Sequence, residues 1–183
     1  MQRVLDIGCG NDKLPGAVGI DVNPNSAADI VRSLDDLPWP LEESSFDRIR
    51  AQDVLEHVEN FLGVVTEIHR VGKPGALVEV RMPFMSSSNY ATDPTHRRSA
   101  TSRTFDYFDP TKDLAKYGYS PARFSLVEFH YVRGYVNNVT GRLMKLLDRG
   151  VVPWLERYPE TYESYFAYLY PMHDVSYVLR VEK

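Results

Sequence analysis

Two glycines and an acid near the N-terminus have the residue types and spacing that nucleotide binding requires. In the segment VLDIGCGNDKLPGAVGIDV, Gly8 and Gly10 follow one apolar run, and a second apolar run leads to Asp21. Glycines at such a turn let a ligand approach the backbone, and an acid after the second strand can accept hydrogen bonds from both ribose hydroxyls. The segment therefore predicts a nucleotide site, with a purely structural turn as the alternative.

The residues after Gly10 narrow the kind of nucleotide. A dinucleotide fingerprint has a third glycine and continues into a helix whose N-terminus binds pyrophosphate. Here Lys13 stands at the third glycine position, and Pro15 and Gly16 leave no room for such a helix. NAD and FAD are therefore disfavoured.

A second group of reactive side chains lies in NYATDPTHRRSATSR, residues 89–103, directly after a predicted strand. We expect His96 to act as a general base or to position an acceptor, with Asp93 orienting it. The same segment supplies an aromatic ring and three cations that could hold an acceptor with an anionic group, namely Tyr90, Arg97, Arg98 and Arg103. The alternative is a solvated surface loop stabilised by Asp–Arg pairs.

The apolar pattern predicts an alternation of strands and helices around these two groups. Strands are expected at 3–7, 17–22, 29–32, 46–51, 76–82, 124–133 and 175–182. Helices are expected at 53–71, 134–150 and 161–170. This order favours an α/β fold with a mostly parallel sheet, whose ligands bind beyond the carboxyl ends of the strands.

Four motifs resemble those of the class I S-adenosylmethionine-dependent methyltransferases. VLDIGCG and GIDV resemble the first two motifs of that family. DDLPWPLEESSFDRIRAQDVLEHV resembles the segment around strand four, and IHRVGKPGALVEVRMP resembles the segment that leads to strand five. Together they span residues 4–83 in the family's order. DPTHRR, YES and YVLRVEK resemble a compact branch close to the type 11 methyltransferases, often seen among small bacterial and archaeal enzymes.

The resemblance implies a Rossmann-like seven-stranded sheet and S-adenosyl-L-methionine as cofactor. Residues carried over to the methionine, ribose, adenine and reaction-centre parts of that site are Asp6, Gly8, Cys9, Gly10, Asp21, Val22, Leu34, Asp35, Gln52 and Asp53. Lys13, in the shortened loop, is expected to meet the carboxylate of the cofactor. Two positions depart from the family: Asp12 replaces its third glycine, and Ser33 replaces the acid near the adenine amine, with Asp35 close by.

The motif DVLEH raises the question of a metal. On the predicted helix 53–71, Asp53, Glu56 and His57 share one face, and His57 joins His96 and Asp93 as a candidate catalytic residue. Some methyltransferases with E-x-x-E-H at this place bind a divalent cation, whereas others have the same residues without a metal. We expect no metal, and keep Asp53, Glu56 and His57 as the alternative ligand set.

Short spacings leave no room for the first and second crossover helices. Only residues 8–16 separate the first two predicted strands, and only 23–28 the next two, whereas a parallel crossover normally needs about a dozen residues. Parallel strands are usually apolar on both faces. We therefore expect either the helical insertion at 134–170, before the last strand, or a second subunit in a homodimer to cover the exposed sheet face.

Composition sets the broad class. The 183 residues carry a net charge of −4 and one cysteine, which argues against a disulfide framework and against a whole-surface nucleic-acid binder. No apolar run is long enough to span a membrane, and no signal peptide is evident, so we expect a cytoplasmic protein without a membrane partner. A single domain at 1–183 is expected, with a cofactor-binding half at 1–83 and an acceptor-binding, sheet-covering half at 84–183.

These observations predict a methyltransferase that acts on a small-molecule acceptor, most simply a hydroxyl of a sugar, a glycan precursor or a similar metabolite. One alternative is a metal-assisted RNA 2′-O-methyltransferase. The other is a cofactor-binding structural or regulatory subunit without catalysis.

Overall fold

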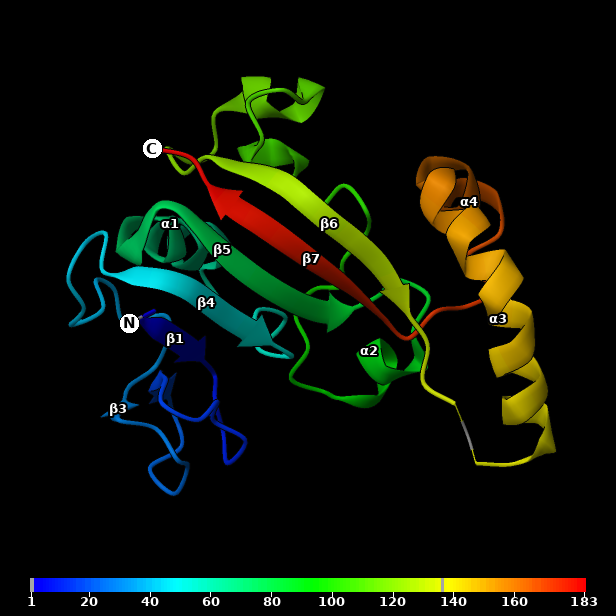
Figure 1. Cartoon of the computed structure of the whole chain (residues 1–183), viewed down its shortest axis with the longest axis horizontal. Helices are drawn as coiled ribbons and strands as arrows, with labels where there is room; N and C mark the ends of the chain where they lie inside the picture. Colours follow the sequence, from blue (N-terminus) through cyan, green and yellow to red (C-terminus); the bar gives the residue numbers. More distant parts are fainter. Residues whose placement is uncertain (1, 136) are drawn as a thin grey trace.

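The computed structural model describes residues 2–135 and 137–183 and contains one seven-stranded sheet (Figure 1). The strand order is β3-β2-β1-β4-β5-β7-β6. β7 is antiparallel to both of its neighbours, and the other pairings are parallel. The strands are β1 (Val4–Ile7), β2 (Val18–Asp21), β3 (Ile30–Val31), β4 (Phe46–Gln52), β5 (Gly72–Pro83), β6 (Phe124–Val132) and β7 (Asp174–Val181). The predicted α/β, mostly parallel sheet is confirmed.

Helices follow the later strands only. They are α1 (Phe61–Val71), α2 (Ser88–Thr92), α3 (Val139–Arg157) and α4 (Pro159–Tyr165), with 3₁₀ turns η1 (Asp106–Phe108) and η2 (Asp113–Tyr117). Among the described residues before β4, none is helical, so the first two crossovers are loops as expected. The helical insertion before the last strand is also present, although α3 starts later and ends later than predicted. Val136, expected in that helix, lies outside the described residues.

The helix predicted from residue 53 begins only at Phe61, which corrects the prediction. Asn60 caps α1 by accepting a hydrogen bond from the Gly63 amide, as an N-cap side chain does. The amides of Glu59 and Asn60 donate to the Asp35 carboxylate. Residues 53–60 therefore form an irregular turn, and Asp53, Glu56 and His57 do not share a helix face.

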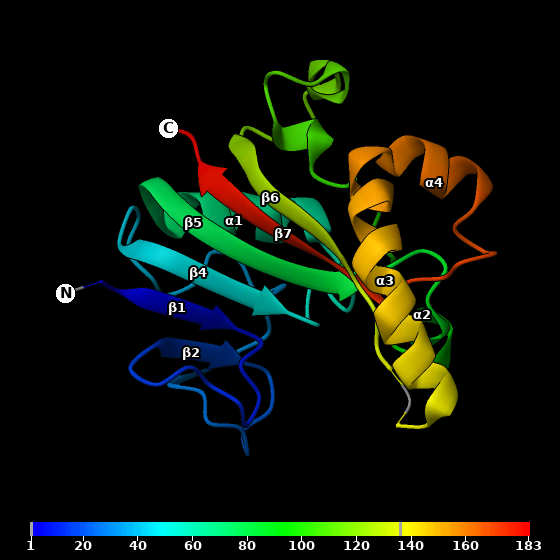
Figure 2. The same cartoon turned by 45° about the vertical axis from the view of Figure 1, so that its right-hand side comes forward.

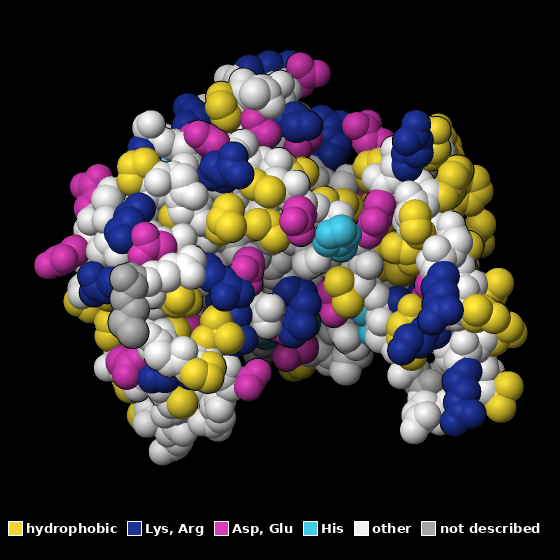
Figure 3. Space-filling view, viewed as in Figure 1, with side chains coloured by type: hydrophobic (Ala, Val, Ile, Leu, Met, Phe, Trp, Pro, Cys, Tyr) yellow, Lys and Arg dark blue, Asp and Glu magenta, His cyan; other side chains and the backbone are white. Residues whose placement is uncertain are grey.

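The sheet is apolar on one face and charged on the other. In β4, Ile49 and Ala51 are fully buried beneath α1, while Arg48 and Arg50 alternate with them on the opposite face. Arg48 forms a bidentate pair with Glu79 of β5, at 2.7 Å for both hydrogen bonds. Figure 3 shows Lys, Arg, Asp and Glu side chains gathered over this face. The premise that both faces must be covered is therefore wrong for this chain, because alternation along the strands gives the open face a polar surface.

The helical insertion does not lie over the N-terminal half of the sheet. Figures 1 and 2 show α3 and α4 beyond the end of β6 and away from β1 and β3. The insertion reaches the core through Leu155 and Tyr162, whose ring stacks on Phe84 at 5.8 Å between centroids. A second subunit as the cover remains a prediction, and the polar character of the face removes the energetic need for one.

Candidate functional site

The glycine turn after β1 faces Asp21 at the end of β2. Gly8 has φ of +63° and Gly10 has φ of +49°, values in the left-handed region that favour glycine. A Cβ on Gly8 would lie 2.3 Å from Cγ2 of Val54, so this position also needs glycine for space. The Gly10 amide donates to Oδ2 of Asp21 at 2.8 Å, and the Asn23 amide donates to Oδ1 at 2.8 Å.

A cavity of about 180 Å³ opens beside this turn. Its lining combines residues predicted for the cofactor with several that were not, namely Gly8, Asp21, Val22, Ser33, Leu34, Asp35, Val54, His57 and Val58. Each Asp21 oxygen accepts one backbone amide and keeps a lone pair for a ribose hydroxyl. Apolar walls from Val22, Leu34 and Val58 suit a purine. The residues present therefore fit an adenosine-bearing cofactor.

Asp6 does not line that cavity and instead stabilises the loop after β1. Its side chain is 1% exposed and forms a bidentate pair with Arg50, at 2.7 and 2.8 Å. The Leu14 amide donates to the same carboxylate at 2.8 Å. Arg50 also donates to the Asp12 carbonyl. Asp6 thus fixes the shortened loop that replaces the first crossover helix, and shapes the turn indirectly.

The loop places the remaining predicted cofactor residues around the cavity without putting them in its lining. Lys13 pairs with Asp29 at 2.9 Å, so its ammonium already has a partner other than a cofactor carboxylate. Cys9 is buried, and burial, followed by the nearby Asp6 charge, raises the pKa of its thiol. Open space adjoins Gly10, because a Cβ there would have nothing within 4 Å.

Asp53, predicted at the reaction centre with Gln52, forms an ion pair with Arg81 of β5. Its φ of +53° turns the chain sharply at the end of β4. Neither Gln52 nor Asp53 lines the cavity. The turn instead directs Val54 and His57 into it.

Three chemically reactive side chains converge next to the cavity. One ligand atom from each of Glu56, His57 and His96 lies within 4.8 Å of the others. The His57 and His96 rings are 4.7 Å apart between centroids, and Nε2 of His96 is 3.9 Å from Oε1 of Glu56. Sequence reasoning listed Glu56 only as a metal ligand on a helix. The structure joins it to His96 through the irregular turn.

Hydrogen bonds fix which nitrogen of each ring is free. His96 Nδ1 lies 3.1 Å from the Tyr90 carbonyl, which can only accept, so Nδ1 carries the proton. Thr95 donates its hydroxyl to Asp93 at 2.6 Å, so at 2.8 Å it accepts from Nδ1 of His57. In its neutral form, each ring therefore keeps an unprotonated Nε2, the atom needed by a general base or a metal ligand.

Asp93 orients a different histidine from the one predicted. Its Oδ2 is 4.0 Å from Nε2 of His96, too far for a hydrogen bond. Its Oδ1 accepts both the amide and the hydroxyl of Thr95. Asp93 therefore acts through Thr95 on His57, and Thr95 is a site residue that sequence reasoning missed. Its hydroxyl two residues after Asp93 is the local signal that could have revealed it.

Glu56 is buried and has no hydrogen-bond partner among the described residues. The residue is 0% exposed, and neither carboxyl oxygen meets a donor from that part of the chain. Burial, followed by the charges of Asp53 and Asp174, raises its pKa to about 7. Burial and the neighbouring His96 lower the pKa of His57. The Glu56 carboxyl group therefore keeps its proton to a pH well above the range of an exposed carboxyl.

The arginines predicted for an acceptor have partners within the chain. Arg98 donates to the carbonyls of Leu55 and Val58, at 2.9 and 2.6 Å, and holds the irregular turn. Arg97 pairs with the exposed Glu59. Arg103 pairs with Asp106 at 2.9 Å and lines an aromatic cleft of about 490 Å³ between α1 and η1. Tyr90 stacks against His96, at 6.0 Å between ring centroids.

Comparison with known proteins indicates which class of enzyme this fold and site resemble. Residues 5–80 match the family model described as a methyltransferase domain. The matched segment contains the glycine turn, Asp21, and the Glu56–His57 pair. The match over residues 5–80, together with the shared fold, supports an S-adenosylmethionine-dependent methyltransferase with S-adenosyl-L-methionine as cofactor. No curated protein matches the sequence.

Solved structures share the fold along almost the whole chain. A SAM-dependent methyltransferase from Archaeoglobus fulgidus is 17% identical with a TM-score of 0.61, covering 98% of this chain and 86% of that one. The YcgJ protein from Bacillus subtilis is 14% identical with a TM-score of 0.59, covering 100% and 92%. Phosphoethanolamine N-methyltransferase 2 from Haemonchus contortus, in complex with S-adenosyl-L-methionine, is 17% identical with a TM-score of 0.54, covering 99% and 48%.

Proposed function

We propose that this methyltransferase acts on a hydroxyl of a small-molecule acceptor, such as a sugar, a glycan precursor or a similar metabolite. The observation that supports it is the position of His57, which lines the cofactor cavity and also belongs to the Glu56–His96 cluster. An acceptor hydroxyl placed there would meet an imidazole with a free Nε2. A small acceptor also suits a chain of net charge −4, which argues against a whole-surface nucleic-acid binder.

In this proposal, one set of residues binds the cofactor and another removes the proton of the acceptor. S-adenosyl-L-methionine, when bound, supplies a methyl group on a sulfonium, and Asp21 with the apolar walls would hold its adenosine part. Asp93 and Thr95 hold the ring of His57, and the Tyr90 carbonyl holds that of His96. Either Nε2 can take the acceptor proton, and Glu56 can accept it further. General bases of this kind contribute roughly 10²- to 10⁴-fold to rate.

A panel of hydroxyl acceptors with isotope-labelled S-adenosyl-L-methionine tests the proposal. Label should enter at least one sugar-type acceptor, and the double variant His57→Asn with His96→Asn should reduce that transfer by at least about a hundredfold while S-adenosylhomocysteine still binds. Glu59→Gln, an exposed acid three residues from Glu56, serves as the control with unchanged transfer. Transfer only to amines or thiols would contradict the hydroxyl assignment.

A metal-assisted RNA 2′-O-methyltransferase is the second candidate. Its support is the mutual distance of the Glu56, His57 and His96 ligand atoms, within 4.8 Å, because one carboxylate and two imidazoles suit a divalent transition metal. Activity on an RNA acceptor that EDTA abolishes and Mn²⁺ restores would favour this candidate. A non-catalytic subunit would bind the cofactor without label transfer to any acceptor.

A further inference from the structure

The arm formed by α3 and α4 carries an unpartnered apolar stripe. Exposed apolar residues along α3 recur with helical spacing, mostly three, four or seven residues apart. This spacing places them on one side of the helix. The stripe consists of Val139, Leu143, Leu146, Leu147, Trp154 and Tyr158, each between 45% and 81% exposed. Figure 3 shows hydrophobic side chains along the outer edge of this arm.

The stripe is not the face that attaches α3 to the protein. Leu155 belongs to the core, and Val151 and Val152 pack against it. Asp148 is buried where it accepts hydrogen bonds from the hydroxyls of Tyr135 and Tyr170. The helix therefore has one apolar face docked on the protein and a second one turned outward.

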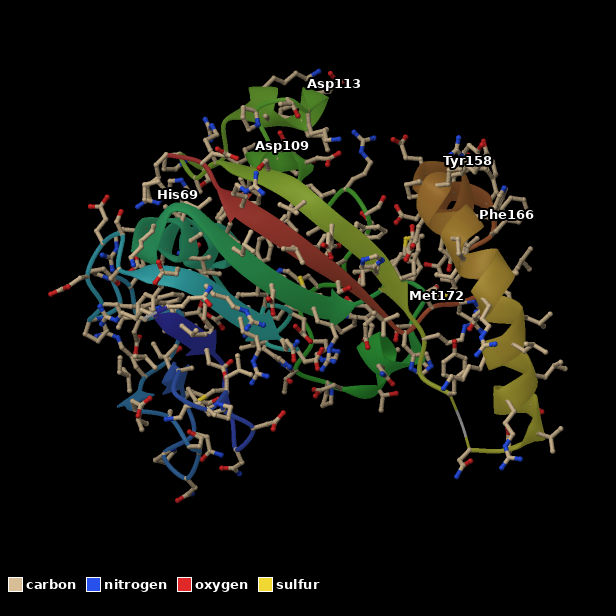
Figure 4. The ribbon with its side chains drawn as sticks, in the orientation of Figure 1. His69, Asp109, Asp113, Tyr158, Phe166 and Met172 are labelled. Atoms are coloured by element: carbon tan, nitrogen blue, oxygen red, sulfur yellow. The ribbon has the colours of Figure 1, made fainter. Side chains whose placement is uncertain are left out.

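Exposed apolar residues, most of them aromatic, also occur on the rest of the arm. Tyr165, Phe166, Tyr168 and Leu169 are exposed in and after α4. Figure 4 shows Tyr158 and Phe166 near the end of the arm, while Met172 lies where the chain returns to the sheet. Tyrosine and tryptophan suit a boundary that is apolar on one side and wet on the other.

The exposed charges of α3 are all positive. Arg142, Lys145, Arg149 and Arg157 are exposed, whereas Asp148 is buried. The remaining acid of the helix, Glu156, turns inward and accepts the Tyr131 amide. A helix with this cationic flank stands out in a chain of net charge −4.

We propose that the α3–α4 arm docks on an anionic lipid surface, with the stripe lying in the headgroup region. A basic amphipathic helix with Leu, Trp and Tyr on its apolar side binds membranes in this way. Pairing with a second copy is less favourable, because the cationic flanks would face each other with no exposed acid on α3 to balance them. No described helix is long and apolar enough to cross a membrane, and lying on a surface requires no such helix. The inference replaces the expectation of no membrane partner and is independent of the acceptor.

Vesicle sedimentation with the full chain tests the proposal. The protein should bind vesicles that contain phosphatidylglycerol and should bind pure phosphatidylcholine at least about tenfold more weakly, with binding lost as salt rises. Arg142→Glu with Arg149→Glu should weaken binding by about thirtyfold or more, equivalent to two contributions of ~1 kcal/mol. Leu143→Glu with Leu146→Glu should abolish it. Val31→Glu, an exposed apolar residue on edge strand β3, is the matched control and should bind like the wild type.

Tryptophan emission gives an independent readout. Of the two tryptophans, Trp39 is 2% exposed and Trp154 is 47% exposed, so a blue shift on docking must come from Trp154 and should vanish in Trp154→Phe. Circular dichroism verifies that each variant is folded. Equal binding by the folded stripe variants and wild type, or no binding to either vesicle, would overturn the proposal. A dimer in light scattering that Leu146→Glu dissociates, without vesicle binding, would assign the stripe to self-association instead.

Discussion

Replacing Glu56 by glutamine should make stability depend on pH in a defined way. The folded protein raises the pKa of this carboxyl from 4.5 to about 7, chiefly by burial. At 1.36 kcal/mol for each pKa unit, ionising Glu56 costs about 3 kcal/mol more in the folded than in the unfolded chain. A group with a raised pKa loses its contribution as pH rises between the unfolded and folded values.

The sign of the stability difference between Glu56→Gln and the wild type follows from this rule. Near pH 4, the wild type has a neutral Glu56 in both states, and Glu56→Gln should have almost the same free energy of unfolding. Near pH 8, the wild type carries a buried charge that glutamine lacks, so the variant should be more stable by about 3 kcal/mol. For a domain of this size that corresponds to a melting-temperature rise of about 6 to 12 °C. His57 titrates in both proteins, so its effect largely cancels in the difference.

Urea unfolding followed by circular dichroism, at several pH values in the presence of a chelator, measures the difference. Glu59→Gln is the control, because that exposed carboxylate pairs with Arg97 on the surface, and its difference from wild type should stay flat. A Glu56→Gln difference that does not change with pH would refute the burial argument. So would a variant that is less stable than the wild type near pH 8.

Two further substitutions test other parts of the site. Arg50→Met leaves the buried Asp6 charge without its bidentate partner and should lower the free energy of unfolding by about 3 to 5 kcal/mol, measured in urea; a loss below about 1 kcal/mol would show that the pair behaves like a surface pair. Thr95→Val removes the group that orients His57 and should lower the transfer rate about tenfold or more without changing the affinity for S-adenosylhomocysteine, measured by single-turnover labelling and calorimetry. An equal loss in rate and affinity would point to a general collapse of the site.

The glycine turn and Asp21 could be placed from the sequence because their signals are local. Of the residues predicted for the cofactor, Gly8, Asp21, Val22, Leu34 and Asp35 line the cavity, and a cofactor role for the others stays a prediction. Apolar runs define β1 and β2. Gly8 and Gly10 lie in the turn between these strands, and Asp21 ends β2. The short loops in place of the first crossover helices follow from counting residues. Such signals are reliable because residues that are close in the sequence also lie close together in the folded protein.

The acceptor side, and the partner of Lys13 on the cofactor side, depended largely on contacts between residues that are distant in the sequence. Helical spacing after Asp53 predicted a helix, but Asp35 and Arg98, distant in sequence, hold residues 53–60 in a turn. Lys13 found Asp29 as a partner, and Asp93 reached His57 through Thr95. Each outcome was decided by tertiary hydrogen bonds, and these decide which polar side chains remain free for a ligand.

The polar sheet face was visible in the sequence as alternation in FDRIRAQ. The general tendency of parallel strands to be apolar on both faces outweighed it in the prediction. In the structure, cross-strand pairs such as Arg48–Glu79 give that face its own network of charges. A local pattern was more informative here than the rule for the fold class.

Calorimetric titration of the cofactor product into wild type and Asp21→Ala tests the central claim, that the turn at Gly8–Gly10 and Asp21 forms the cofactor site. Wild type should bind S-adenosylhomocysteine and S-adenosyl-L-methionine at one site and should not bind NAD. Asp21→Ala should weaken binding by about tenfold or more, because a charged acceptor for ribose hydroxyls contributes about 1.5–3 kcal/mol, while Asp36→Ala, a nearby exposed acid, should leave it unchanged. Wild type that binds neither methyl donor nor product, or Asp21→Ala that binds as tightly as wild type, would contradict the account.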